Sequence, residues 1–435
     1  MVPAESNNRE ETHEVVAGAA DGAGADVAAT AVTAATGEPN CAKPWQLLSG
    51  LAISGFLLAL PGGLLPLWGY HIHPDYGLAG NNFLALALGV IGGGELARRL
   101  GRGASLMQLL SAGCFGAGLA LLMLSVAAPP AQIWYEWVAL LVTGVAAGVV
   151  NTAVFEAITP CYEGNPAQVT LLAGIFFGAG SMAAAWMMSE SFGESSSFGG
   201  LSWTGEWNAT RLLAITALLP AAAAVAYRRL RVAPVAAPEF PVEEGLRDLR
   251  SPLAIFFALL LFFQFANEWS IAGWLPVFLI DRLGISPETS VGLLGGYWGA
   301  LVLGRVVASR LLRVVGHGRM LAVSAFCALF GCAAVLAAGS RFGVVTGLLL
   351  TGAGFSAIYP LAAERIASRF SYYHPGYFNG IFTFALVGGM LAPFVLGHLA
   401  EAWGLRVVPL AVMVGSCAVF GLVPVIWLGR KVTGR

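Results

Sequence analysis

The sequence predicts an all-α membrane protein whose twelve transmembrane helices form two pseudo-symmetric six-helix bundles. Three observations lead to this fold class: an apolar composition, a series of apolar runs, and a one-sided distribution of basic residues. Hydrophobic residues make up 57% of the 435 residues and charged residues only 11%, with a mean hydropathy of +0.75. Soluble domains carry about 25% charged residues, so most of this chain is suited to lipid.

The apolar runs are each about 20 residues long, which is enough to cross a hydrocarbon core of roughly 30 Å. Each run must be helical, because lipid offers no partners to backbone N–H and C=O groups. We expect spans at 45–69, 80–97, 104–127, 132–155, 167–189, 208–227, 252–280, 289–311, 320–338, 342–365, 376–398 and 404–428.

The basic residues test this layout. If both termini are cytoplasmic, 19 of the 23 Lys and Arg residues fall on the inner side, and the exceptions are Arg211, Arg282, Arg341 and Arg406. Cytoplasmic loops of membrane proteins carry this excess of positive charge. The pattern therefore predicts a multi-pass protein of the cell membrane with both ends in the cytoplasm.

The composition also divides the chain into four parts. Residues 1–42 are rich in Ala, Gly, Thr and acids and predict a disordered tail. Residues 43–228 are expected to form the N-terminal bundle and 252–435 the C-terminal bundle. Residues 229–251, which carry several prolines and charges, are expected to form a cytoplasmic linker between them.

Several function classes find no support in the sequence. The net charge of -1 gives no reason to expect nucleic-acid binding. The cysteines are scattered, so neither a metal nor another cofactor is predicted, and His71, His73 and Asp75 fit a solvated outer loop better than a metal site. We find no ATP-binding Walker motif and no catalytic constellation near an interface, and we expect that the protein is not an enzyme.

Short motifs recur in the two halves. Leu140-Leu141-Val142-Thr143-Gly144 is echoed by Leu348-Leu349-Leu350-Thr351-Gly352, and Glu156 and Glu364 each lie twelve residues after the glycine. Gly94 to Arg102 and the stretch from Gly304-Arg305 to Arg319 are both glycine-and-arginine turns. Chance is the alternative, but the equal spacing favours a duplicated architecture.

With these motifs, residues 45–430 resemble the major facilitator superfamily, whose signature loop runs Gly-x-x-x-Asp-Arg-x-Gly-Arg. The stretches from Asn267 to Pro276, Tyr297 to Arg305, Leu171 to Gly180 and Gly354 to Pro360 are similar to the fucose-permease-like branch of sugar–proton symporters. The resemblance implies the major facilitator fold, a monomer, and transport by alternating access. The sequence departs from the family where Arg98 and Arg313 replace the signature aspartates.

Glu268 is the clearest candidate for transport chemistry. It lies deep in the seventh span, and a charge there costs roughly 2.5–3.5 kcal/mol unless a cavity or partner receives it. No basic residue is expected at its depth. Helical spacing places Gln264, Asn267, Ile271 and Trp274 beside it on one face, which should line a cavity between the halves. The alternative is a glutamate with a purely structural role.

Further candidates are aromatic or polar residues away from the span ends. Sugar rings stack on aromatic faces, and side-chain hydroxyls and amides bond sugar hydroxyls. We therefore add Trp269, Trp274, Tyr297, Trp298, Tyr359 and Asn379 to the predicted substrate site, with ordinary packing as the alternative. Asn151 is expected to bond neighbouring helices instead.

Charged residues at the inner helix ends suggest a cytoplasmic gate. We expect Arg98, Arg99 and Arg102 to lie near Glu156, and Arg310 and Arg313 near Glu364. Ion pairs made in one state and broken in another would bias a two-state equilibrium. The alternative is that these arginines are only topology signals.

The leading hypothesis is a secondary transporter for a small polar solute, with a sugar as the expected substrate. Proton symport is open: the first span carries no acid, so Glu268 alone would have to carry the proton. The competing hypotheses are efflux of amphipathic drugs or metabolites, which an apolar first-half cavity wall would favour, and a transport-inactive scaffold or sensor.

Overall fold

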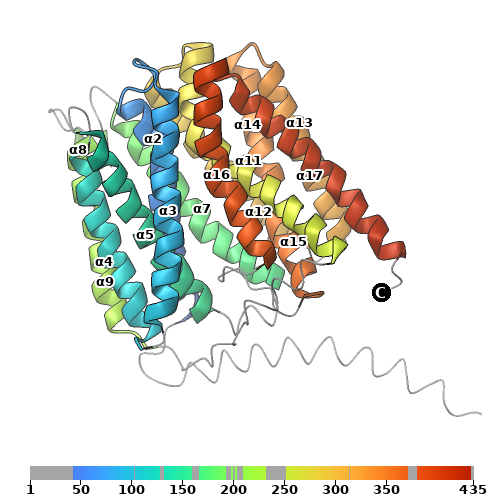
Figure 1. Cartoon of the computed structure of the whole chain (residues 1–435), viewed down its shortest axis with the longest axis horizontal. Helices are drawn as coiled ribbons and strands as arrows, with labels where there is room; N and C mark the ends of the chain where they lie inside the picture. Colours follow the sequence, from blue (N-terminus) through green and yellow to red (C-terminus); the bar gives the residue numbers. More distant parts are fainter. Residues whose placement is uncertain are drawn as a thin grey trace, which may run out of the picture.

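The computed structural model describes residues 43–101, 103–127, 132–158, 166–192, 197–198, 201–202, 209–231, 251–312, 314–370 and 380–432. The predicted tail, most of the predicted linker, and the predicted site residues Arg102, Arg313 and Asn379 lie outside these ranges. Within them the chain is built almost entirely of long helices, and the first six spans (blue to green) and last six (yellow to red) form two groups in Figure 1.

Twelve helical stretches are long and apolar enough to cross a membrane, which confirms the predicted number. In the first half they are α2 (Pro44–Leu67), α3 (Tyr76–Leu100), α4 (Leu106–Ser125), α5 (Ile133–Ala157), α7 (Pro166–Glu190) and the pair α8 (Ala209–Thr216) and α9 (Leu218–Arg228). In the second half they are α11 (Pro252–Leu283), α12 (Pro287–Leu311), α13 (His317–Ala337), the pair α14 (Arg341–Phe355) and α15 (Ile358–Ala367), α16 (Gly380–Trp403) and α17 (Val407–Val432). A two-residue hairpin, β1 (Ser197–Phe198) and β2 (Leu201–Ser202), precedes α8.

Local sequence explains where the helices begin and end. Asp75 caps α3 by accepting a hydrogen bond from the Leu78 N–H (2.8 Å), and Ser286 caps α12 by accepting one from the Thr289 N–H (3.3 Å). Proline opens α2, α11 and α12, where its missing N–H has no cost. Gly284 ends α11 with a positive φ of 58°. Asp75 is therefore a helix cap, and the described residues contain no group of three potential metal ligands around it or elsewhere.

The tenth span is broken, although the sequence predicts it as continuous. Helix α14 ends at Phe355 and α15 begins at Ile358, with Ser356 and Ala357 between them. A break of this kind frees backbone carbonyls from the helical hydrogen-bond ladder, and inside a membrane they need other partners. The Ser356 carbonyl finds one in the guanidinium of Arg305.

The two halves contact each other chiefly through α2 with α11, α3 with α16, and α7 with both α12 and α15. We call the end at which α2 begins the cytoplasmic face, following the charge pattern, and the opposite end the outer face. Near the outer face the backbones come very close: a Cβ added to Gly62 would lie 2.2 Å from the carbonyl oxygen of Ala272. Glycine at such a contact lets two helices pack closely.

Polar contacts also join the halves at the outer face. The carboxylate of Glu401 in α16 accepts hydrogen bonds from the backbone N–H groups of Tyr76 (2.8 Å) and Gly77 (3.3 Å) at the start of α3. The Ser189 hydroxyl of α7 donates to the carbonyl of Glu288 in α12 (2.8 Å). The outer ends of the two halves are therefore joined in this structure.

Candidate functional site

A cavity of about 170 Å³ lies between the two halves and is lined by both. It has room for on the order of ten water molecules. Residues of α2, α3, α5 and α7 form its first-half wall, and residues of α11, α12, α15 and α16 form the second. Its lining extends to Phe155, Thr170 and Phe382, which lie in the cytoplasmic halves of their helices. The cavity therefore begins below the joined outer ends and extends toward the cytoplasmic face.

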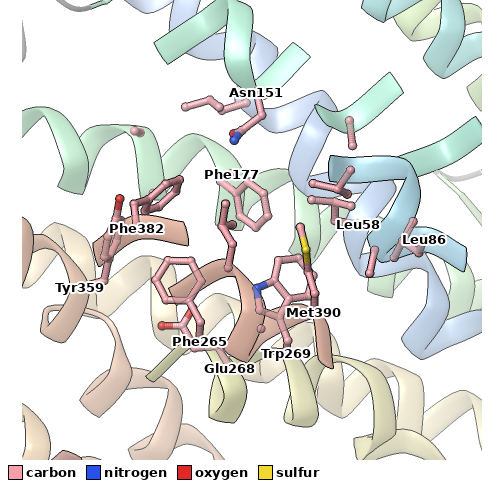
Figure 2. Close-up of a pocket in the computed structure, with 18 of the residues that line it drawn as sticks. Leu58, Leu86, Asn151, Phe177, Phe265, Glu268, Trp269, Tyr359, Phe382 and Met390 are labelled. Atoms are coloured by element: carbon pink, nitrogen blue, oxygen red, sulfur yellow. The ribbon is translucent and has the colours of Figure 1, made fainter. Parts of the chain in front are cut away.

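Helix α11 presents Phe265, Glu268 and Trp269 to this cavity, and Figure 2 shows their side chains together on one side of it. Their spacing of three and four residues is that of one helix face. The adjacent face, which carries Gln264, Asn267, Ile271 and Trp274, is buried against other helices and does not line the cavity. The predicted polar stripe is present on α11, but Glu268 lies at its edge, and the other members face neighbouring helices instead of the cavity.

Each displaced member of the stripe has a structural role. The amide of Gln264 donates a hydrogen bond to Glu268 Oε1 (2.8 Å), so Gln264 helps to position the Glu268 carboxyl group. Asn267 donates to the Ser416 hydroxyl of α17 (3.3 Å). The Trp274 indole donates to the Pro393 carbonyl of α16 (2.9 Å), and its ring packs against Tyr76 and Phe83 of the first half.

Arg305 is a cavity residue that the sequence analysis missed. It lies six residues before the end of α12, is only 5% exposed, and lines the same cavity as Glu268. Its Nη1 donates to the Gly174 carbonyl of α7 (2.5 Å) and its Nε to the Ser356 carbonyl (3.4 Å). The cavity that Glu268 lines is therefore also lined by a basic residue.

An aromatic cluster surrounds the acid. Phe265 packs edge-on against Tyr359 (ring centroids 5.1 Å apart) and against Phe382 (6.3 Å), and Trp269 packs edge-on against Phe177 of the first half (6.2 Å). Figure 2 shows these residues around the pocket. Trp269 and Tyr359, two of the residues assigned to the substrate site from the sequence, line the cavity.

Tyr297 and Trp298 lie behind this cluster. They are 0% and 1% exposed and do not line the cavity, so in this structure neither is placed to touch a solute. Among the described residues, the Tyr297 hydroxyl and the Trp298 indole nitrogen have no hydrogen-bond partner. The Trp298 ring contacts Phe177, a first-half residue of the cavity wall (ring centroids 6.3 Å apart).

The first-half wall is mostly apolar. Its described residues are leucine, alanine, valine, phenylalanine and glycine, together with two polar residues, Asn151 and Thr170. Asn151 was expected to bond a neighbouring helix, but it lines the cavity, and Figure 2 shows it across Phe177 from the α11 residues. This wall can add few hydrogen bonds to a solute.

The predicted gate residues have different partners from those expected. Glu95 pairs with both Arg98 (2.7 Å) and Arg99 (2.6 Å) on the same helix, at the i,i+3 and i,i+4 spacings. Glu364 lies 3.1 Å from His317 at the start of α13. Glu156 and Arg310 form no ion pair with the described residues. The pairs of Arg98 and Arg99 are thus local to α3, whereas the Glu364 pair joins α15 to α13.

Solved structures of transporters share this fold. The E. coli fucose:proton symporter FucP superposes with a TM-score of 0.60 at 17% identity, over 88% of this chain and 98% of that one. The nucleoside transporter NupG superposes with a TM-score of 0.63 at 14% identity, over 88% and 99%. At these identities the likeness concerns the fold alone.

Curated relatives match over shorter stretches. An uncharacterized transporter of Sinorhizobium fredii, y4wD, is 31% identical over 162 residues, which is 37% of this chain and 42% of the relative. A glucose/galactose transporter of Brucella abortus is 29% identical over 154 residues, which is 34% of this chain and 36% of the relative. The chain thus aligns with only about two fifths of the length of these relatives.

A family comparison covers much more of the chain. The model of the Major Facilitator Superfamily matches residues 47–386, from the first span into the eleventh. This range includes every described residue of the cavity except those toward the outer half of α16. Twelve spans, a cavity between two halves, and this match lead to one conclusion: the chain belongs to the major facilitator superfamily.

Proposed function

We propose that the protein is a secondary active transporter that moves a small polar solute, a sugar, across the cell membrane by alternating access coupled to protons. The observation that carries this proposal is that an acid and a base, Glu268 and Arg305, both within membrane-spanning helices, line one cavity between the two halves. Charged groups at this depth mark solute and ion pathways in membrane proteins.

The chemistry of the second-half wall suits a sugar. A carboxylate accepts hydrogen bonds from hydroxyl groups, a guanidinium donates them, and an indole ring offers an apolar face for the C–H side of a sugar ring. Glu268, Arg305 and Trp269 provide these three elements around the same space. The names of the relatives, a glucose/galactose transporter and a fucose:proton symporter, support the same class of solute.

The contacts at the two faces support alternating access. At the outer face, Glu401 and Ser189 join the halves, while the cavity extends toward the cytoplasmic face. We interpret this arrangement as the inward-facing state of a rocking cycle, in which the outer contacts break and cytoplasmic contacts form when the cavity opens outward. Glu268 is the only acid among the described residues that line the cavity, so it is the candidate proton carrier.

Uptake into proteoliposomes tests this proposal. The purified protein is reconstituted and supplied with labelled glucose, galactose or fucose, with and without an inward proton gradient. We expect gradient-stimulated uptake of at least one of them, and Glu268→Gln should abolish the stimulation. Glu288→Gln, which changes an exposed acid at the outer face, is the matched control and should leave it unchanged. Uptake that responds neither to the gradient nor to Glu268→Gln would remove Glu268 from the mechanism.

The apolar first-half wall favours a second candidate, efflux of an amphipathic drug or metabolite. Leu58, Phe83, Leu86 and Val90 would contact the apolar part of such a solute, while Glu268 and Arg305 contact its polar part. The same vesicles distinguish the two functions. Proton-driven movement of an amphipathic dye such as ethidium, with no hexose movement, would replace the sugar proposal by the efflux proposal.

A further inference from the structure

A buried polar cluster lies at the outer end of the first half, away from the cavity. Its members are Tyr70 in the connection between α2 and α3, Asn82 in α3, and Glu136 in the first turn of α5. They are 7%, 1% and 3% exposed, and none of them lines the cavity between the halves. The proposed transport chemistry therefore does not use this cluster, and its buried acid needs another explanation.

The three side chains of the cluster contact one another. The Asn82 amide donates a hydrogen bond to the Tyr70 hydroxyl (3.1 Å), and both side chains are within hydrogen-bonding reach of the Glu136 carboxyl group. Burial, together with the charge of Glu136, raises the pKa of Tyr70, so its hydroxyl keeps its proton and remains a donor. Because donors favour the charged form of a carboxyl group, this arrangement suits an ionised Glu136.

Two oxygen atoms of the cluster have no hydrogen-bond partner among the described residues. They are Glu136 Oε2 and Asn82 Oδ1, and both are buried. An ionised carboxylate oxygen and an amide oxygen can only accept hydrogen bonds, so neither atom can satisfy the other. Buried polar atoms without a protein partner are positions where proteins hold an ion or a water molecule.

No basic residue balances the negative charge of the cluster. Among the described residues, Glu136 forms no ion pair with Lys, Arg or His, although His71 and His73 closely follow Tyr70 in the chain. The other charged group that interacts with Tyr70 is Asp75, which is also an acid. A buried carboxylate without a counter-charge is costly, so a cation within the cluster would lower that cost.

We propose that Tyr70, Asn82 and Glu136 bind a sodium ion, which supplies the positive charge that the cluster lacks. The ligand atoms are a phenol, an amide and a carboxylate oxygen, and hard cations prefer oxygen ligands. One carboxylate balances a monovalent ion, whereas a divalent ion would leave an excess charge. Such a site needs no group of several acids, histidines or cysteines, so it is consistent with the lack of one among the described residues.

The position of the cluster indicates what the ion does. It ties the start of α3 to α5 and to the connection that follows α2. The neighbouring residue Asn81 points to the second half, where its Oδ1 lies 3.3 Å from His398 Nε2 of α16, and the first residues of the same helix bind Glu401. Sodium therefore fixes the first-half side of the contacts that join the two halves at the outer face.

Binding of radioactive sodium to the purified protein tests the site directly. The ionic strength is held constant with choline, and we expect saturable binding of a single ion. Glu136→Gln should weaken this binding about tenfold or more, because the charge of the ligand is lost. Glu190→Gln changes an exposed acid at the outer end of α7 and is the matched control, which should bind sodium as the wild type does.

A second variant guards against poor folding of Glu136→Gln. Tyr70→Phe removes one neutral oxygen and no charge, and it should also weaken sodium binding. Thermal unfolding gives an independent measure, because an ion that binds only the folded state stabilises it by mass action. Sodium should raise the Tm of the wild type above its value in choline, and this rise should be smaller in Tyr70→Phe and absent in Glu136→Gln.

Three results would overturn the sodium site. A wild-type protein that binds no more sodium than Glu136→Gln would show that the cluster holds no sodium. A Tm that rises when the pH is lowered in choline, but not when sodium is added, would identify Glu136 as a protonated acid. Sodium affinity that is unchanged in both Glu136→Gln and Tyr70→Phe would place the ion elsewhere in the chain. These measurements need neither a sugar nor a proton gradient, so their outcome is independent of the uptake experiment.

Discussion

The outer latch formed by Glu401 yields a quantitative prediction. Its carboxylate accepts two hydrogen bonds from the free N–H groups at the start of α3, at 2.8 Å from Tyr76 and 3.3 Å from Gly77. The start of a helix carries a partial positive charge, so a carboxylate there is favoured twice, by the hydrogen bonds and by the dipole. Glu401→Gln keeps the shape of the side chain and removes the charge.

The expected magnitude follows from the position of the contact. A carboxylate at an exposed helix start contributes about 0.3–1 kcal/mol, and the Tyr76 contact lies at the protein surface. Glutamine can still accept one hydrogen bond, so the loss should be about 0.5–1 kcal/mol. Because 1.4 kcal/mol corresponds to a factor of ten, the ratio of outward-open to outward-closed protein should rise about two- to fivefold.

Spin labels at Ile72 and Glu288, exposed residues of the first and second halves at the outer face, measure this ratio through the distance between them. The effect should shrink at high salt because the contact is exposed. Glu190→Gln is the control, since Glu190 is an exposed acid at the outer end of α7. An unchanged ratio in Glu401→Gln would refute the reasoning. So would an equal rise in Glu190→Gln, because the effect would then come from surface charge in general.

Three further predictions follow from the packing. Trp269→Ala should raise the KM of solute uptake about 2- to 10-fold, because an aromatic contact is worth about 0.5–1.5 kcal/mol. Trp269→Phe should recover most of the loss, and equal KM values in wild type and both variants would count against a stacking role. Trp274→Ala should cost about 3–5 kcal/mol of stability, since the side chain is 0% exposed and packs against both halves. Thermal unfolding in detergent measures this loss, and a Tm equal to that of wild type would contradict the prediction. Glu95→Gln should lower the free energy of unfolding by less than about 1 kcal/mol, because the ion pairs of Glu95 with Arg98 and Arg99 are largely exposed. A larger loss, seen as a large fall in Tm, would contradict the view that these pairs are ordinary surface ion pairs.

The architecture was predictable because lipid imposes a simple length and composition rule. Each expected span corresponds to a helix within a few residues; the spans expected at 80–97 and 289–311, for example, correspond to α3 and α12. Hydropathy could not reveal the break at Ser356, because the residues on both sides of it are as apolar as those in a continuous helix. The break is seen in the helix boundaries, where α14 ends at Phe355 and α15 begins at Ile358.

The site was predictable only in part, and the α11 stripe shows why. Helical spacing correctly grouped Gln264, Asn267 and Trp274 on one face, but periodicity cannot say which face of a buried helix meets water and which meets other helices. Polar residues occur on both, because a buried amide in lipid also needs a partner. Asn267 has Ser416 and Trp274 has the Pro393 carbonyl, so their polarity serves the packing of the second half.

Arg305 was missed for a related reason. Its position near the end of α12 looks like a topology signal, and most arginines at such positions are topology signals. A long side chain can reach inward as well as outward, and the sequence alone gives no direction. The direction follows from two residues far away in the chain: Gly174, which leaves room for the guanidinium, and Ser356, whose carbonyl is free because a helix breaks there. Glycine and serine are both common in membrane helices, so neither residue alone indicates from the sequence that it contacts Arg305.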